Sequence, residues 1–231
     1  MQDAETLPPS RQPMFNAPIV VVAMSLVLIA LYGLFSLGSY EQQVRAIYDF
    51  GVVPRRFWAE AGDIDAYPGI GQKALSLLST AFLHGSWAHV ITNSGMLLAF
   101  GSPAARALGP GPVGVGKWML LFGGSVVVGS LAYLLMAGPD AVAAVGASGG
   151  TSGLMAAAML IGPGLVVTPP ITRRFLTFTL VFVIANVVLA LLGPAALGMG
   201  IAWEAHAGGY VAGALLMMAL GGGRRRFGNA G

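Results

Sequence analysis

Residues 202–220 read AWEAHAGGYVAGALLMMAL, an almost uninterrupted apolar run that contains one histidine, His206, and one acid, Glu204. A helix of about 20 such residues is long enough to cross the hydrocarbon core of a bilayer. Gly209 and Gly213 are four residues apart, so they share one face of this helix and allow a second helix to approach closely. The stretch predicts a membrane-spanning helix that packs against a partner through its glycines.

The composition of the whole chain places its other segments in the same environment. Hydrophobic residues make up 56% of the 231 residues and charged residues only 9%. A soluble globule of this length could not cover so much apolar surface, so the composition excludes that class and predicts a polytopic membrane protein. The chain has no cysteine, which excludes disulfides and thiolate metal sites.

Six segments are apolar and long enough to be spans, and prolines and charges collect between them because both are costly inside a lipid-facing helix. The predicted fold class is an all-α polytopic membrane protein with six transmembrane helices in one membrane domain, residues 19–220. The predicted spans are Ile19 to Leu37, Leu75 to Phe100, Trp118 to Met136, Ala143 to Ile161, Phe175 to Leu192 and Ala202 to Leu220.

The polar segments outside these spans predict one interfacial loop and two tails. Residues 38–74 are too polar to span and too aromatic for a simple linker, so we expect a partly helical loop with Trp58 and Tyr67 at headgroup level. Residues 1–18 do not resemble a cleavable signal peptide and predict a cytoplasmic tail. Residues 221–231 predict a disordered basic tail, whose arginines suit an anchor to anionic lipids better than a nucleic-acid site.

The positions of lysine and arginine predict the orientation, because cytoplasmic loops retain positive residues. With the N-terminus inside, the outer segments keep their positive residues within the one long loop, together with most of the acids. The inner segments carry Arg11, Arg106, Lys117, Arg173, Arg174 and the arginines of 224–226, and the outer ones carry Arg45, Arg55, Arg56 and Lys73. Both termini are therefore expected in the cytoplasm.

Two potential catalytic groups, Ser148 and His206, fall at similar depth in this topology. Ser148 starts the fourth span near its outer end, and His206 lies just below the outer end of the last span. A hydroxyl is a poor nucleophile until a base takes its proton, and a neutral imidazole within hydrogen-bond reach can do so. No acid lies inside a span to orient the ring, and Glu204 points away from the His206 face. A Ser-His dyad is thus predicted rather than a triad.

Each of these residues also has a simpler structural interpretation. Ser148 could cap the fourth helix. His206 could be a hydrogen-bonded histidine between helices, although ionisable groups at membrane depth are functional as a rule. Gly209 and Gly213 fit helix packing better than catalysis under either interpretation. We expect them to pack against the start of the fourth span, which carries Gly149, Gly150 and Gly153.

A third pattern lies in the second span, where Asn93 follows His89 by four residues. On a helix both side chains share one face and can direct donors at a single point, which suits an oxyanion. The backbone N–H of Ser148, at a helix N-terminus, would add a further donor. Alternatively, His84 and His89 could bind a metal or Asn93 could join two helices, but no inward carboxylate completes a metal site. No metal and no cofactor are expected.

Together these patterns resemble the rhomboid family of intramembrane serine proteases, of the six-span bacterial type. The similarity covers the second to sixth predicted spans. It rests on His84-Gly85-Ser86-Trp87-Ala88-His89 followed by Asn93, on Gly146-Ala147-Ser148-Gly149, and on Ala205-His206-Ala207-Gly208-Gly209 followed by Gly213.

The resemblance implies a rhomboid-like fold and a serine endopeptidase with Ser148 as nucleophile and His206 as general base. It places His89 and Asn93 at the oxyanion site. The implied substrates are single-span membrane proteins, cut near the outer membrane face, and the implied location is a bacterial inner (plasma) membrane. The lipid bilayer is then the second partner, and no nucleic acid is expected.

Two positions depart from the family's pattern. The family often has an aromatic residue four positions after the nucleophile, resting against the catalytic ring, and here Ser152 occupies that position. We therefore expect the His206 ring to be held differently. The long loop has Arg55-Arg56-Phe57-Trp58 where the family tends to have a Trp-Arg pair.

Two other functions remain as alternatives. A catalytically silent rhomboid-like protein would bind transmembrane clients without cutting them, but it would have no physical need for both Ser148 and His206. A small transporter or channel would have internal pseudo-symmetry and broken helices along a path, and the sequence suggests neither.

Overall fold

The computed structural model describes residues 17–197 and 200–221, which form helices joined by loops, with no β-strand in those ranges. The predicted tails, 1–18 and 221–231, lie almost entirely outside the described residues. The elements in chain order are α1 (Ile19–Ser36), α2 (Tyr40–Phe50), α3 (Pro54–Trp58), α4 (Ile70–Ser79), η1 (Thr80–Phe82), α5 (Trp87–Met96), η2 (Leu97–Gly101), α6 (Ser102–Leu108), α7 (Gly111–Met136), α8 (Ser148–Met159), η3 (Pro163–Leu165), α9 (Arg173–Leu197) and α10 (Trp203–Gly221).

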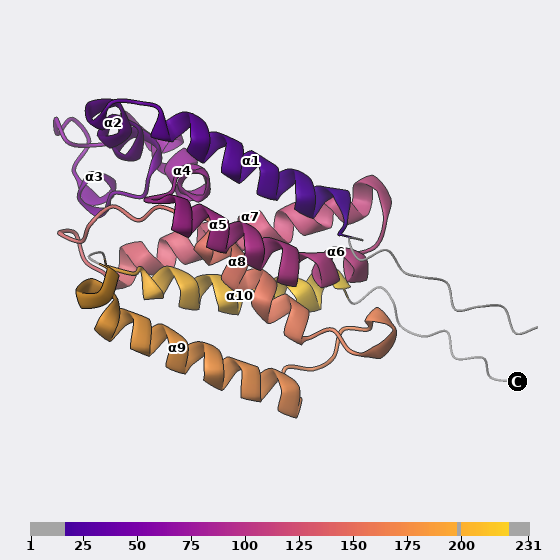
Figure 1. Ribbon diagram of the computed structural model, residues 1–231. Coiled ribbons are helices and arrows are strands. Elements are labelled where there is room, and N and C mark those ends of the chain that lie inside the picture. The colour runs from indigo at the N-terminus through magenta and orange to yellow at the C-terminus, as the bar shows by residue number, and fades with distance from the viewer. Residues whose placement is uncertain (1–16, 198–199, 222–231) are drawn as a thin grey trace, which may run out of the picture.

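Helix α8 is the centre of the bundle. Most of its residues are buried, and it packs against both α7 and α10. Helices α1 and α9 lie on opposite sides of this centre (Figure 1). The described side chains of helix α9 are mostly exposed, and its contacts with other helices, chiefly α8 and α10, are few. The apolar surface of α9 thus suits contact with lipid rather than with protein.

The long helices alternate in direction, so the connections collect at two ends (Figure 1). The segment with α2, α3 and α4 lies at one end. The start of α1 and the end of α10 lie at the other, together with α6 and the first residues of α7 and α9. These last elements carry Arg106, Arg173 and Arg174. The clustering of these charges at one end agrees with the distribution that the topology prediction used.

Among the helices of residues 17–197 and 200–221, three are long and apolar enough to cross a membrane. They are α1, α7 and residues Arg173–Gly193 of α9, with mean hydropathies of 2.6, 2.0 and 2.6. The chain is therefore an all-helical integral membrane protein. Helix α8 has only 12 residues, so the crossing of the bilayer by all six predicted spans stays a prediction.

The predicted second span, Leu75 to Phe100, is not one helix. Helix α4 ends at Ser79, and the chain leaves helical geometry before α5 begins at Trp87. The restart follows from Ser86, whose hydroxyl accepts a hydrogen bond from the backbone N–H of His89 at 3.1 Å and caps the new helix. The chain then stays helical through the π-helical turn η2 to Leu108. The span prediction missed the cap because it weighed apolar length alone.

The predicted fourth span, Ala143 to Ile161, begins later than expected. Residues 141–147 lie outside any helix, and Ala144 forms an isolated antiparallel bridge with Val52. Gly146 has a φ of 122°, which a residue with a Cβ adopts only at a cost, so the turn requires glycine there. The backbone N–H of Gly146 donates to the carbonyl of Thr80 at 2.9 Å. These contacts with distant segments keep residues 143–147 out of the helix, so α8 begins only at Ser148.

The predicted packing of the fourth and sixth spans through glycines is confirmed. A Cβ at Gly209 would overlap the backbone of Gly149, and a Cβ at Gly213 would overlap the backbone of Gly153. Gly150 differs from the expectation, because it faces α7 instead of α10. Helices α8 and α10 are therefore in backbone contact at two levels.

We expect Gly209→Ala to destabilise the protein, because backbone atoms of Gly149 occupy the space that the methyl group needs and cannot rotate away. Overpacking of this kind costs about 1 to 3 kcal/mol, which thermal unfolding in detergent would detect. Gly116→Ala on α7 is the matched control, since a Cβ there meets nothing within 4 Å. Equal melting temperatures for the two variants would contradict the backbone contact.

The loop between α1 and α4 folds around one buried cation. Arg56 is 6% exposed, and its guanidinium donates to the backbone carbonyls of Tyr48, of Asp65 at 3.1 Å and of Ala66 at 3.3 Å. The same group lies over the ring of Tyr48, 3.8 Å from the centroid. Arg56, one of the two arginines that stand where the family tends to have a Trp-Arg pair, thus lies at the centre of the loop.

The two aromatic residues predicted at headgroup level have different places. Trp58 is half exposed, and its indole N–H donates to the carbonyl of Leu134 at 3.2 Å, which joins the loop to α7. Tyr67 is buried, and its hydroxyl donates to the carbonyl of Gly51 at 2.6 Å. The Tyr67 ring lies inside the loop against the Arg56 guanidinium, 4.4 Å from its centroid, and its predicted headgroup level stays a prediction.

Candidate functional site

Ser148 is the first residue of α8. Its backbone N–H therefore lies at a helix N-terminus, as the oxyanion prediction expected. The capping position is occupied by Ala147, and no side chain caps this helix. The interpretation of Ser148 as a structural cap is therefore not supported. A cavity of about 20 Å³ lies beside Ser148, bordered by Gly146 and Ala205 among others. That volume has room for about one water molecule.

His206 lies in the first turn of α10, on the helix that packs against α8. A Cβ at Gly149 would lie 3.4 Å from the carbonyl oxygen of Ala205, so the two backbones are close there. Ser148 directly precedes Gly149, and His206 directly follows Ala205. Within the described residues no hydrogen bond joins the Ser148 hydroxyl to His206. Catalytic hydrogen bonds often form or tighten only when substrate is bound, so a dyad does not require this bond in the structure without substrate.

His89 and Asn93 lie on α5 and converge on Gly146, as their spacing predicted. A Cβ at Gly146 would lie 2.7 Å from His89 Nε2 and 3.8 Å from Asn93 Nδ2. The absence of a side chain at Gly146 therefore brings both groups next to the segment that leads into Ser148. This places two potential donors from α5 beside the start of α8.

Asn93 has a buried donor without a partner. The residue is 3% exposed, and its Oδ1 accepts a hydrogen bond from Thr151 Oγ1 at 3.2 Å. Its Nδ2 has no hydrogen-bond partner within the described part of the chain. Leaving a buried donor unpaired costs about 1 to 3 kcal/mol, so such a group in a native protein needs an explanation. A transient acceptor supplied by a substrate would satisfy it.

His84 lies behind His89 and supports the same segment. It is fully buried, and its Nε2 accepts a long hydrogen bond, 3.5 Å, from the backbone N–H of Ala147. The rings of His84 and His89 meet edge to face, with centroids 5.0 Å apart. In the described ranges, no three residues of the His, Cys, Asp and Glu types gather as a metal site.

His206 has a partner on α9 that no sequence motif indicated. Asn186 on α9 lies with its Oδ1 2.7 Å from His206 Nδ1. Asn186 is the single amide in the predicted fifth span, and polar residues in transmembrane helices often bond across helices. A single amide in an apolar span is thus a signal for a contact residue, but it cannot identify the partner, because the partner lies on another helix.

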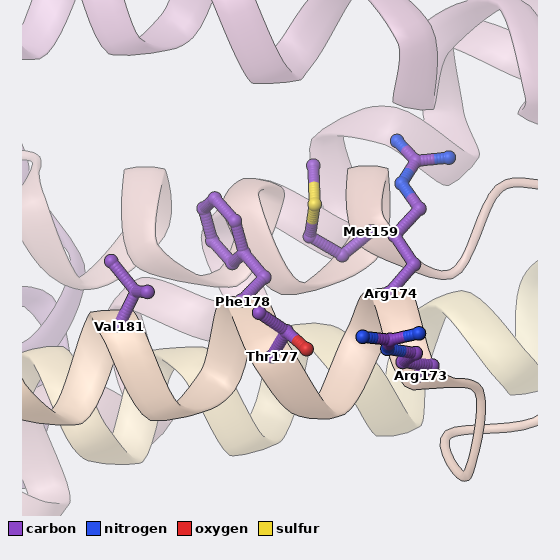
Figure 2. A pocket seen from close by; sticks show the side chains of 6 residues that line it. All are labelled: Met159, Arg173, Arg174, Thr177, Phe178 and Val181. Carbon is purple, nitrogen blue, oxygen red and sulfur yellow. The ribbon is translucent and has the colours of Figure 1, made fainter.

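A larger hollow, of about 490 Å³, lies away from these residues (Figure 2). It is bordered by Met159, the last residue of α8, and by residues of the first turns of α9. Ser148 is at the opposite end of α8, so this hollow is not part of the candidate site. Its lining residues are Met159, Arg173, Arg174, Thr177, Phe178 and Val181.

Comparison with known proteins identifies the family. Among curated proteins, none matches the chain. The family model described as the Rhomboid domain matches residues 71–223, which is more than half of the chain and includes Asn93, Ser148 and His206. The chain belongs to the rhomboid family of membrane proteins.

Proposed function

We propose that the protein is an intramembrane serine endopeptidase that cleaves transmembrane segments of membrane proteins. Membership of the rhomboid family supports hydrolase chemistry on membrane proteins in general. The observation that carries the specific proposal is the unpaired, buried Nδ2 of Asn93, which lies with His89 beside the segment before Ser148. A donor held without an acceptor at that place suits an oxyanion that exists only during reaction.

In the proposed reaction, Ser148 Oγ attacks the carbonyl carbon of the scissile peptide bond while His206 takes its proton. The carbonyl oxygen becomes an oxyanion and accepts hydrogen bonds from Asn93 Nδ2, from His89 and from the backbone N–H of Ser148. When the intermediate collapses, the C–N bond breaks and His206 gives its proton to the leaving nitrogen. Water then attacks the acyl-enzyme, with His206 as base, and releases Ser148.

The proposal includes a topology. Six spans cross a bacterial inner (plasma) membrane, both termini lie in the cytoplasm, and residues 38–74 rest at the outer interface. The two ends of the bundle support this, because the start of α1 and the end of α10 share one end and the α2–α3 segment lies at the other (Figure 1). Substrates would then be cut near the outer face.

Labelling with a fluorophosphonate tests the proposal, because the reagent reacts with an activated serine and needs no knowledge of the substrate. We expect the folded wild-type protein in detergent to be labelled at Ser148, and Ser148→Ala and His206→Ala to remain unlabelled. Heat-denatured wild-type protein is the control for nonspecific reaction. A folded but unlabelled wild-type protein would instead favour the catalytically silent client-binding alternative.

A further inference from the structure

The ring of His206 is held from α9 by one hydrogen bond. Asn186 Oδ1 lies 2.7 Å from His206 Nδ1, and Asn186 Nδ2 donates to the carbonyl of Phe182 at 2.8 Å. Because the amide nitrogen is used within α9, the amide oxygen is the atom that faces the ring. An amide oxygen only accepts hydrogen bonds. His206 must therefore carry a proton on Nδ1 to make this contact.

The position of that proton decides whether the ring can act as a base. A neutral imidazole has one N–H and one nitrogen with a free lone pair. With the proton on Nδ1, the lone pair is on Nε2, and Nε2 is then the nitrogen that can accept a proton from the hydroxyl of Ser148. Asn186 thus selects one of the two neutral forms and also limits rotation of the ring.

The small side chain of Ser152 gives the His206 ring no surface to rest against. Ser152 lies on α8 one turn after Ser148 and is buried. A serine there cannot provide the flat apolar surface against which a ring could rest. A hydrogen bond in the plane of the ring, from α9, can fix the orientation of His206 without stacking.

We propose that Asn186 is a positioning residue that holds His206 in the form able to accept a proton from Ser148. This inference rests on the proposed function. Two side-chain hydrogen bonds join the described part of α9 to α10, namely Asn186 with His206 and Thr179 with Tyr210, the latter at 2.8 Å. The second bond involves no residue of the candidate site, so it provides a matched control.

The experiment compares Asn186→Leu, Asn186→Asp and Thr179→Val with the wild-type protein. Asn186→Leu removes the acceptor, and we expect it to lower kcat and the rate of fluorophosphonate labelling about 10-fold, the value of one lost net hydrogen bond, with KM unchanged. Asn186→Asp keeps an oxygen acceptor and should restore most of the rate. Thr179→Val loosens α9 without touching His206 and should keep the wild-type labelling rate.

A second measurement does not depend on activity. Nitrogen-15 NMR of histidine-labelled protein distinguishes the two neutral forms of an imidazole, and His206→Gln identifies the His206 signals. We expect the Nδ1–H form in the wild-type protein and in Thr179→Val, and a mixture of both forms in Asn186→Leu. A wild-type protein that shows this NMR pattern but does not react with the fluorophosphonate would overturn the proposed function. The contact of Asn186 with His206 would still stand.

Three results would overturn the positioning role of Asn186. One is an unchanged labelling rate in Asn186→Leu. Another is an equal loss in Thr179→Val, which would show that the attachment of α9 matters and the ring contact does not. The third is the same mixture of neutral forms in the wild-type protein and in Asn186→Leu.

Discussion

Replacing Ser148 or His206 by alanine is expected to abolish cleavage of a transmembrane reporter. In a Ser-His unit, loss of either the nucleophile or the base costs on the order of 10⁶-fold in kcat. The physical reason is that the hydroxyl is a poor nucleophile without the base, and the base has no nucleophile to activate without the hydroxyl. Cleavage of the reporter in reconstituted vesicles, followed over time for each variant, measures the effect.

The double variant distinguishes a catalytic unit from two separate defects. Because Ser148 and His206 act together in the proposed reaction, the double variant should be no slower than either single one. Ser152→Ala, which removes a hydroxyl from the same helix, is the matched control and should still cleave. Wild-type-like cleavage by Ser148→Ala would end the proposal. Losses that multiply in the double variant would argue against a dyad.

Asn93→Ala is expected to cut kcat by roughly 10²- to 10³-fold, as the loss of one oxyanion donor does. The oxyanion forms only after Ser148 attacks, so the donor favours the transition state over the bound substrate and KM should hardly change. Nδ2 has no hydrogen-bond partner among the residues that the structure describes, so Asn93→Ala breaks no described hydrogen bond through that atom. Steady-state kinetics with the transmembrane reporter give both parameters.

A control separates this role from helix packing. The contact of Asn93 Oδ1 with Thr151 Oγ1, 3.2 Å long, is also lost in Asn93→Ala, and an average bond between transmembrane helices is worth about 0.6 kcal/mol. Thr151→Val removes the same contact, together with the hydrogen bond from the Thr151 hydroxyl to the carbonyl of Ser148 at 3.1 Å, but leaves Nδ2 in place. We expect similar small losses of thermal stability in both variants, and a large loss of kcat only in Asn93→Ala. Full turnover in Asn93→Ala would exclude it from the oxyanion site.

Much of the fold could be predicted from local signals. The helices α1, α7, α9 and α10 lie close to predicted spans, because long apolar runs between prolines and charges depend on the bilayer and on no other segment. The glycines of α10 predicted its contact with α8, since small residues four apart mark one face of a helix. The shared face of His89 and Asn93 followed from helical periodicity in the same way.

The errors have a common cause. The capping bond of Ser86 interrupts an apolar run that looked continuous, and the contact of Gly146 with Thr80 keeps the residues before Ser148 out of the helix. In each case a contact made by one particular atom outweighs the average polarity of the segment, and average polarity is what a span prediction measures.

The sequence by itself determined that this is a helical membrane protein, and it marked Ser148, His206, His89 and Asn93, because composition, periodicity and short motifs are properties of neighbouring residues. Only the tertiary structure decided that Gly146 opens the space between α5 and the start of α8, and that Asn93 Nδ2 finds no partner there among the described residues. It also decided which atom of Asn186 faces the His206 ring. These features depend on distances between helices that are far apart in the chain, and helix packing sets those distances.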